Sequence, residues 1–285
     1  MKKRLLVIAV LLMAAFVCIT VLNGMDTELS PSEPSGSGTA ATDTADIKPS
    51  SKGSPYKFYF ERLTPVEKRV YNAIIEKIYD MPERIAVPKI DGKELDNVFS
   101  ALLFDNPDLF FLGRKCAVET RMWLTYFSVD YIIDKADIAD MRERLERECE
   151  TFEQTLTEPG NQWRTELEIH DHVIDRCEYH DPEGDLIYSS SYGALVNGRA
   201  ACEGYSKAVK LLLDRAGIEN ALISGVSENG EGSGGAHMWN IVNIGGDYYH
   251  LDCTWDDPVS DDGGKLRMYT CLLYTSPSPR DPKTS

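Results

Sequence analysis

Three residues in the C-terminal half of the chain could together perform nucleophilic chemistry: Cys202, His237 and Asp252. A cysteine thiolate attacks carbonyl carbon, a histidine accepts and returns a proton, and a carboxylate orients the imidazole ring. The cysteine lies within Gly198–Ile218, where apolar residues recur at three- and four-residue spacing and end at Gly217. This spacing predicts a helix that carries Cys202 in its first turn.

The position of Cys202 favours a reactive thiol. Unpaired backbone N–H groups give a helix N-terminus a partial positive charge, which favours a thiolate, and a neighbouring imidazolium favours it further. Gly204 permits the close approach of another segment. Glu203 opposes ionisation of the sulfur, although this effect is small where the carboxylate faces solvent. The alternative is a buried packing role, the commonest role for a free cysteine.

The other two residues fall on predicted strands. Residues 220–227, 236–244 and 248–255 read as strands, and a Gly-Gly-Asp turn joins the last two into a hairpin. Such a hairpin would bring His237 and Asp252 to about the same level of the sheet, within contact distance. Further residues of these strands are assigned supporting or packing roles: Trp239, Asn240, His250, Trp255 and Asp256.

The order of cysteine, histidine and aspartate on a helix start and adjacent strands resembles the transglutaminase-like superfamily of papain-type folds. The resemblance covers residues 163–269 and is carried by "GRAACEGYSKAVKLLL", "AHMWNIV" and "YYHLDCTWDDP". The upstream "DNPDLFFL" and "EIHDHVIDRCEYHD" also resemble the helical preface of bacterial extracytoplasmic members. The resemblance to this superfamily implies an α+β fold, with a nucleophile helix packed on an antiparallel sheet and a mainly helical N-terminal preface.

The resemblance also implies roles for the three residues and a reaction class. Cys202 would be the nucleophile, His237 the base and Asp252 the orienting acid. The superfamily uses this triad for crosslinking, peptide cleavage and deglycosylation, so we predict action on peptide or glutamine-type amides through a cysteine acyl-enzyme. Hydrolysis is slightly favoured over amine transfer, and a catalytically silent surface binding module is the alternative.

The oxyanion hole is only partly predictable. The backbone N–H of Cys202 is a natural donor. The resemblance implies an additional side-chain donor from upstream, for which Trp163, Tyr192 and Asn197 are open candidates.

A histidine-rich segment near residue 175 could suggest a metal site, because His170, His172, Cys177 and His180 lie close together in the sequence. Residues 163–179 predict a helix, however, and residues two apart on a helix point to different faces. Neither a CxxC nor an HExxH spacing is present. We therefore expect packing or surface roles for these residues, and neither a metal nor a cofactor.

The N-terminus predicts export. Positive charge precedes the unbroken apolar run 5–22, a pattern typical of a signal peptide or a signal anchor, and we favour an uncleaved anchor. Cys18 raises a lipoprotein alternative, which Phe16 and Val17 disfavour because small residues are expected there. The Ser/Thr/Pro-rich segment that follows cannot bury enough surface to fold. We expect an extracytoplasmic protein, anchored or secreted, whose membrane contact is the anchor alone.

The spacing of apolar residues predicts the helices and strands of the remaining regions. Helices are predicted from Thr64 to about Tyr79, from Asp91, and over 134–158, with one or two strands within 115–133. The tail from Cys271 resembles a translated sequencing adapter and is interpreted as non-native read-through.

The predicted organisation is thus a signal anchor or signal peptide (1–24), a disordered stalk (25–55), a helical N-terminal region (56–160), a catalytic domain (161–270) and a read-through tail (271–285).

Composition limits the partners. The chain has 46 acidic and 30 basic residues and a net charge of −16, so nucleic acid and anionic lipid surfaces are poor partners. A protein or peptide substrate, such as one in the cell envelope, fits better. Four further cysteines could pair in an exported protein, but no spacing demands a disulfide: Cys116, Cys149, Cys177 and Cys253.

Overall fold

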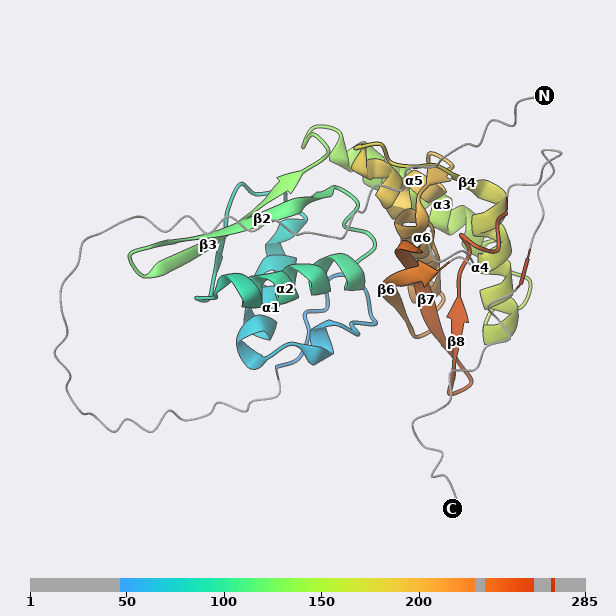
Figure 1. Ribbon diagram of the computed structural model, residues 1–285, viewed down its shortest axis with the longest axis horizontal. Coiled ribbons are helices and arrows are strands. Elements are labelled where there is room, and N and C mark those ends of the chain that lie inside the picture. Colours follow the sequence, from blue (N-terminus) through green and yellow to red (C-terminus); the bar gives the residue numbers. More distant parts are fainter. Residues whose placement is uncertain (1–46, 229–233, 259–267, 270–285) are drawn as a thin grey trace, which may run out of the picture.

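The computed structural model describes residues 47–228, 234–258, 268 and 269. They form two lobes, seen on the left and right of Figure 1. The predicted signal anchor, most of the stalk and the read-through tail lie outside the described residues. Within the described part, no helix is both long and apolar enough to cross a membrane.

The N-terminal lobe combines two helices with a three-stranded antiparallel sheet. Its elements are η1 Phe60–Arg62, α1 Pro65–Ile78, β1 Ile85–Val87, α2 Gly92–Asp105, β2 Leu112–Arg121 and β3 Leu124–Tyr131, with β3 between β1 and β2. Capping boxes begin both helices: Thr64 pairs with Glu67, and Asp91 with Glu94. The two helices were predicted from the sequence, and one or two strands were predicted in the region of β2 and β3, whereas β1 was not predicted.

The second lobe carries the predicted site. Its elements are α3 Ile138–Glu153, α4 Gln162–Arg176, β4 Glu178–Tyr179, η2 Leu186–Ser189, α5 Ser191–Leu195, β5 Arg199–Ala200, α6 Cys202–Arg215, β6 Asn220–Glu228, β7 Gly234–Ile244 and β8 Asp247–Leu251. Strands β6, β7 and β8 form an antiparallel sheet with β7 in the centre. The predicted α+β class is confirmed.

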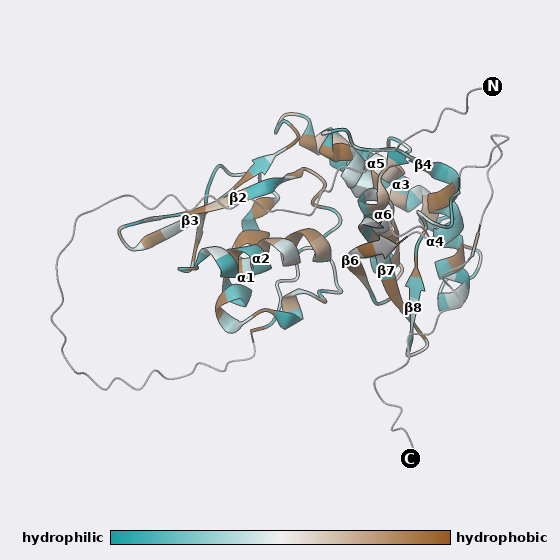
Figure 2. Ribbon diagram, viewed as in Figure 1, coloured by the Kyte–Doolittle hydropathy of each residue, from teal (hydrophilic) through white to brown (hydrophobic). Residues whose placement is uncertain are grey.

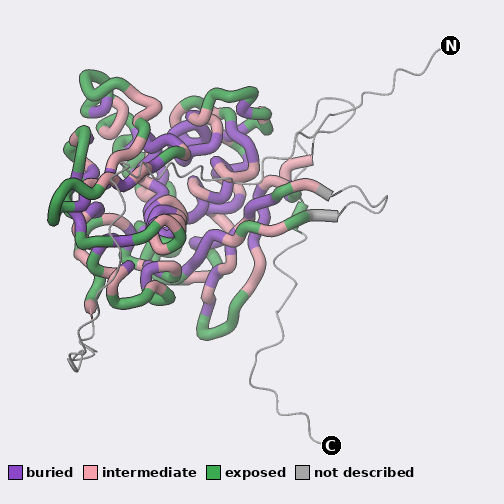
Figure 3. The backbone as a smooth tube through the Cα atoms, turned by 60° about the vertical axis from the view of Figure 1, so that its left-hand side comes forward, coloured by how far each residue is buried: buried purple, intermediate pink, exposed green. Residues whose placement is uncertain are grey.

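Helix α6 is central to this lobe. Val209, Leu212 and Leu213 of its apolar stripe are at most 2% exposed, whereas Ala216, the residue after the helix, is exposed. Figure 3 shows the buried residues concentrated in the interior of the molecule, and Figure 2 shows apolar residues on the elements that pack there. Gly217, with φ +71°, follows the helix end in the left-handed conformation that favours glycine. The helix predicted from the sequence therefore forms, and Cys202 is its first residue.

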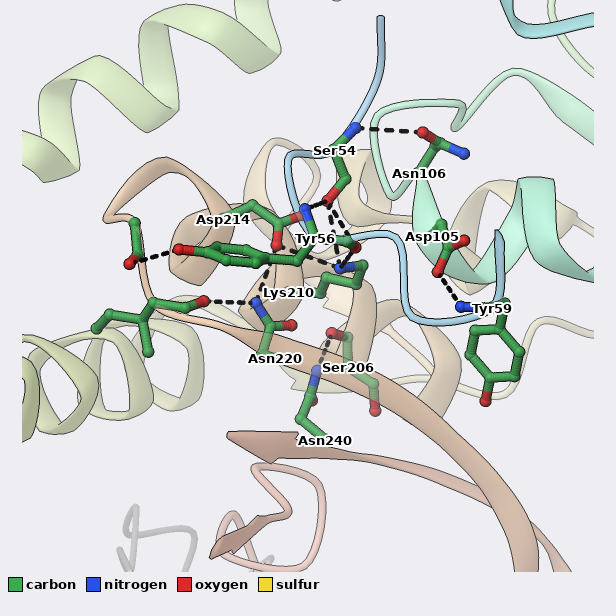
Figure 4. Close-up of polar contacts among 12 residues, drawn as sticks. Ser54, Tyr56, Tyr59, Asp105, Asn106, Ser206, Lys210, Asp214, Asn220 and Asn240 are labelled. Carbon is green, nitrogen blue, oxygen red and sulfur yellow. Dashed lines mark hydrogen bonds and ion pairs between the residues drawn. The ribbon is translucent and has the colours of Figure 1, made fainter. Parts of the chain in front are cut away.

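The folded region begins earlier than predicted. Ser54, assigned to the stalk, is only 6% exposed. The buried ammonium of Lys210 on α6 lies 3.4 Å from the Ser54 hydroxyl and 3.3 Å from the Tyr56 carbonyl oxygen, and it pairs with Asp214 at 3.2 Å (Figure 4). A buried ammonium requires such partners, so the segment around residue 54 is fixed against α6.

The helix α3 lies with the second lobe, although we predicted it within the N-terminal region. Arg215 of α6 forms ion pairs with Glu146 and Glu153 of α3. Arg176 of α4 pairs with Glu148 of α3 at 2.7 Å. These contacts connect α3 to both long helices of the second lobe.

Two other boundaries differ from the predictions. Helix α4 ends at Arg176 rather than near Tyr179, because Cys177 is extended and the next two residues pair in parallel with β5. The sequence of residues 263–270, "GGKLRMYT", predicts a turn followed by a strand, but its two described residues, Met268 and Tyr269, belong to no strand. Instead, the Met268 backbone N–H donates to the carbonyl oxygen of Asp256 at 2.9 Å.

Candidate functional site

Cys202 stands at the first position of α6, where the chain turns from the short strand β5 into the helix. The preceding residue, Ala201, donates its N–H to the Tyr188 carbonyl oxygen at 2.9 Å. A Cβ atom on Gly204 would lie 2.7 Å from that same oxygen and 2.6 Å from the Cβ of Ala200. Glycine is therefore required here, because only its lack of a side chain allows the start of α6 to pack this closely.

His237 and Asp252 are in direct contact, as the sequence predicts. Nε2 of His237 lies 2.6 Å from Oδ2 of Asp252. The second carboxylate oxygen, Oδ1, accepts the backbone N–H groups of Thr254 and Trp255, each at 3.2 Å. Both oxygens of Asp252 are thus engaged, which fixes the direction of its bond to the imidazole.

The route to this contact differs from the predicted one. Strand β8 ends at Leu251, and its register pairs Leu251 with Asn240. Asp252 therefore leaves the ladder instead of continuing along one face of the strand. The turn that it caps with Oδ1 brings its other oxygen to His237.

His237 also interacts with Cys202, so the three predicted residues meet. Burial opposes charge on the imidazole, but hydrogen bonds to Asp252 and Cys202 outweigh it and raise the pKa of His237 to about 9. Nε2 is bonded to Asp252, which leaves Nδ1 as the imidazole nitrogen available to the sulfur. This arrangement favours an imidazolium beside the sulfur at neutral pH.

Two tryptophan rings stack on the imidazole of His237. The ring centroids of Trp239 and Trp255 lie 5.9 and 5.3 Å from it, with interplanar angles of 21° and 25°. Aromatic faces stabilise a nearby cation. Trp239 in turn donates from Nε1 to Nδ1 of His250 at 2.9 Å. His250, predicted to be structural, therefore contacts the Trp239 ring that stacks on His237.

Glu203 does not face solvent, because its side chain is only 15% exposed. It forms an ion pair with Arg114 of β2 and another with Lys207 at 2.8 Å. Burial raises its pKa, but Lys207 and Arg114 outweigh burial and hold the pKa of this carboxyl below its ordinary value. The carboxylate next to Cys202 is therefore neutralised by two cations rather than screened by water.

A tyrosine that we did not single out lies within electrostatic reach of the thiol. Burial raises the pKa of Tyr179, and the charge of Cys202 raises it further. Tyr179 pairs with Ala200 in the β4–β5 ladder, two residues before the cysteine. Of the open oxyanion candidates, Trp163 packs against Tyr249, Tyr192 stacks on Phe110, and the backbone N–H of Asn197 donates to the Tyr192 carbonyl oxygen at 3.2 Å.

The histidine-rich segment does not converge on one point. His170 contacts Asp171 at 3.0 Å and Asp256 at 3.3 Å, whereas His172 packs against Phe152. His180 packs against Tyr188 instead. Among the residues that the structure describes, no group of three or more potential ligands is placed to hold a metal ion.

Glu166 is buried beside His170 and has an unusual environment. Within the described residues, neither of its carboxylate oxygens has a hydrogen-bond partner. Burial raises its pKa to about 7, against the smaller opposing effect of His170. Glu166 thus keeps a proton in the folded protein at pH values where the unfolded chain has lost it.

The unfolding free energy should consequently fall as the pH rises from about 4.5 to 7, by on the order of 3 kcal/mol from Glu166 alone. The raised pKa of His170 acts in the same direction, since its contribution is lost as the pH rises through that value. We expect Glu166→Gln to flatten this dependence and to be more stable than the wild type at pH 8. Urea unfolding at pH 5 and pH 8 measures the change in unfolding free energy for both proteins. Glu168→Gln, on the same helix but with its carboxylate paired with Arg164 at 2.8 Å, is the control; equal slopes in both variants would contradict this account.

A cleft between the lobes adjoins the first turn of α6. Its lining comes from both lobes: Leu103, Phe104 and Phe110 on one side, and Glu203, Lys207 and Met238 on the other. Glu203 directly follows Cys202, and Met238 directly follows His237. The cleft therefore begins beside the residues that the sequence predicts to be reactive.

The part of the chain that contains these residues also matches a family model. Residues 150–253 match the transglutaminase-like superfamily. This segment is a transglutaminase-like domain. The resemblance inferred from the sequence is confirmed, and so is the papain-like form of its α+β fold. The match begins within α3.

Solved structures provide more distant matches. They include a TGase (TM-score 0.34, 13% identity, 65% of this chain and 58% of that chain) and a predicted cysteine protease from Cytophaga hutchinsonii (0.33, 14%, 50% and 56%). The periplasmic domain of TgpA from Pseudomonas aeruginosa also matches (0.29, 16%, 48% and 55%). The chain spans about half the length of the solved structures that it matches. No significant match was found among curated proteins.

The transglutaminase-like domain and its flanks contain only reduced cysteines in the described part of the chain. Four of these thiols are buried, and Cys202 is the partly exposed one: Cys116, Cys149, Cys177, Cys253 and Cys202. Burial raises the pKa of both Cys116 and Cys149 to about 12. Accessibility therefore distinguishes Cys202 from every other described thiol.

Proposed function

We propose that this protein is an extracytoplasmic thiol enzyme that acts on peptide or glutamine-type amides. The observation that carries the proposal is the contact of His237 with both Asp252 and Cys202, at the N-terminus of a helix in a transglutaminase-like domain. The apolar and cationic lining of the neighbouring cleft offers contacts for the side chains of a protein substrate. The charged and apolar N-terminal sequence supports the extracytoplasmic setting.

In this proposal the Cys202 thiolate attacks the amide carbonyl carbon and forms a tetrahedral intermediate. The backbone N–H of Cys202, at the first turn of the helix, is placed to stabilise the oxyanion. His237, as an imidazolium, gives its Nδ1 proton to the leaving nitrogen, the C–N bond breaks, and a thioester remains. Asp252 holds the ring by its Nε2 proton throughout.

Resolution of the thioester decides between hydrolysis and transfer. Neutral His237 takes a proton from water, the hydroxide oxygen bonds to the acyl carbon, and the carboxylic acid leaves as the thiolate re-forms. An amine would follow the same path and give a new amide. We favour hydrolysis, because water reaches the partly exposed Cys202 without a second binding site, whereas amine transfer needs one.

The test uses the full chain and a library of acyl-glutamine and peptide substrates, with and without a primary amine. Release of ammonia or of a new N-terminus without added amine supports hydrolysis; incorporation of the amine supports transfer. Cys202→Ala is the control and should abolish both products. A protein that binds peptides from the library but gives neither product would favour the alternative, a silent binding module.

A further inference from the structure

The first turn of α6 is joined to β7 by a buried serine. Ser206 lies one helical turn after Cys202 and is 4% exposed. Its Oγ lies 2.8 Å from the carbonyl oxygen of Cys202 and 2.9 Å from that of Met238. A hydroxyl has one proton, so the two carbonyl groups share a single donor. This hydroxyl therefore bridges the nucleophile's own backbone and the residue next to His237.

A second buried group makes the same connection from the strand. Asn240 on β7 is 1% exposed, and its Nδ2 donates to the carbonyl oxygen of Ser206 at 3.0 Å (Figure 4). The helix α6 and the strand β7 are thus joined by two hydrogen bonds, one donated by a side chain of the helix and one donated by a side chain of the strand. Such contacts are directional and are strengthened by the low dielectric of the interior, so they fix the helix along β7 more narrowly than apolar packing does.

We propose that Ser206 and Asn240 are positioning residues that hold the Cys202 thiol against His237 by fixing the first turn of α6 on β7. The inference rests on the proposed function. The reacting groups come from two different elements, so their separation depends on how these elements are joined. A shift of about 1 Å between such groups can cost roughly 100-fold in rate. Neither residue touches the sulfur or the imidazole through its side chain in any of the contacts above.

The experiment measures the rate of iodoacetamide alkylation of Cys202 between pH 5 and 10, together with thermal unfolding. We expect Ser206→Ala to lower the rate at pH 6 at least tenfold and to move the profile toward that of an ordinary thiol, with a pKa of about 8.5. Ser206→Thr keeps the hydroxyl, which can still reach the carbonyl four residues earlier, and should retain the wild-type profile.

A matched control separates positioning from loss of stability. Ser191 on α5 is also a fully buried helical serine, and its Oγ donates to a distant backbone carbonyl, that of Pro107, at 2.6 Å. Ser191→Ala should lower the melting temperature about as much as Ser206→Ala. Its alkylation profile should stay within twofold of the wild type, because it removes no contact between α6 and β7.

The outcomes are distinct from those of the proposed function. A Ser206→Ala protein that keeps the wild-type profile overturns the positioning role and leaves the proposed function intact. If Cys202 of the wild-type protein is alkylated at pH 6 no faster than the other cysteines, the proposed function itself is overturned. If the Ser206→Ala chain does not fold, Asn240→Leu, which removes the amide at similar volume, decides instead: an unchanged profile overturns the inference, and a shifted one supports it.

Discussion

Iodoacetamide will alkylate Cys202 at pH 6 at least tenfold faster than any other described cysteine, and His237→Ala will remove this advantage. At pH 6 an ordinary thiol with a pKa of about 8.5 is less than about 1% thiolate. An imidazolium beside the sulfur favours the thiolate, and the raised pKa of His237, about 9, keeps the ring charged well above neutral pH. Mass spectrometry of the cysteine peptides over a pH series measures the labelling.

The matched control for this experiment is His172→Ala. His172 is a histidine of the same lobe, but it packs against Phe152 rather than against a thiol. Its removal should leave the labelling of Cys202 unchanged. A Cys202 that follows the pH curve of an ordinary thiol in the wild-type protein would contradict the catalytic interpretation and favour the binding module.

Asp252→Asn should reduce turnover by roughly 100-fold or more while the domain remains folded. The amide oxygen can still accept the N–H groups of Thr254 and Trp255, so the turn is preserved. The negative charge that stabilises the imidazolium is lost, however, and the pKa of His237 should fall. The basic limb of the pH–rate profile, expected near pH 9 in the wild type, should then move toward 6.5.

This expectation has a specific competitor, because Asp256 and Asp257 follow closely in the sequence. In the structure Asp256 contacts His170 at 3.3 Å, and Asp257 accepts the hydroxyl of Tyr205 at 2.7 Å. Asp256→Asn and Asp257→Asn should therefore leave the basic limb in place. Near-wild-type turnover and an unmoved limb in Asp252→Asn would assign the orienting role to another residue.

The sequence predicted those features that depend on local patterns. The capping boxes at Thr64 and Asp91 and the stripe of α6 each involve residues within one or two helical turns, so their spacing alone predicts the elements. The contact of His237 with Asp252 was predicted because a tight turn sets the register of a hairpin. Strand β8 nevertheless ends one residue before Asp252, since the carboxylate caps a turn that alternation alone does not reveal.

Other features depend on residues that are distant in the sequence. The partner of Glu203 on β2, Arg114, precedes it by 89 residues, and no local pattern connects the two. The approach of Tyr179 to the thiol depends on a two-residue parallel ladder, which is too short to give a periodic signal. The contact of Ser206 with β7 could not be predicted for another reason. A serine inside a helix suggests neither a packing nor a chemical role until the strand that faces it is known.

The burial of Lys210 has a practical consequence for where a shortened chain can begin. A version starting at Tyr56, the boundary that composition suggests, would lack Ser54 and place a new terminal ammonium beside the buried one of Lys210. Two positive charges would then compete for the single carboxylate of Asp214, on the helix that begins with Cys202. Expression boundaries upstream of Lys48, whose carbonyl oxygen accepts the side-chain amide of Asn72 on α1, avoid this conflict and keep the contacts of Ser54 and Tyr56 with α6.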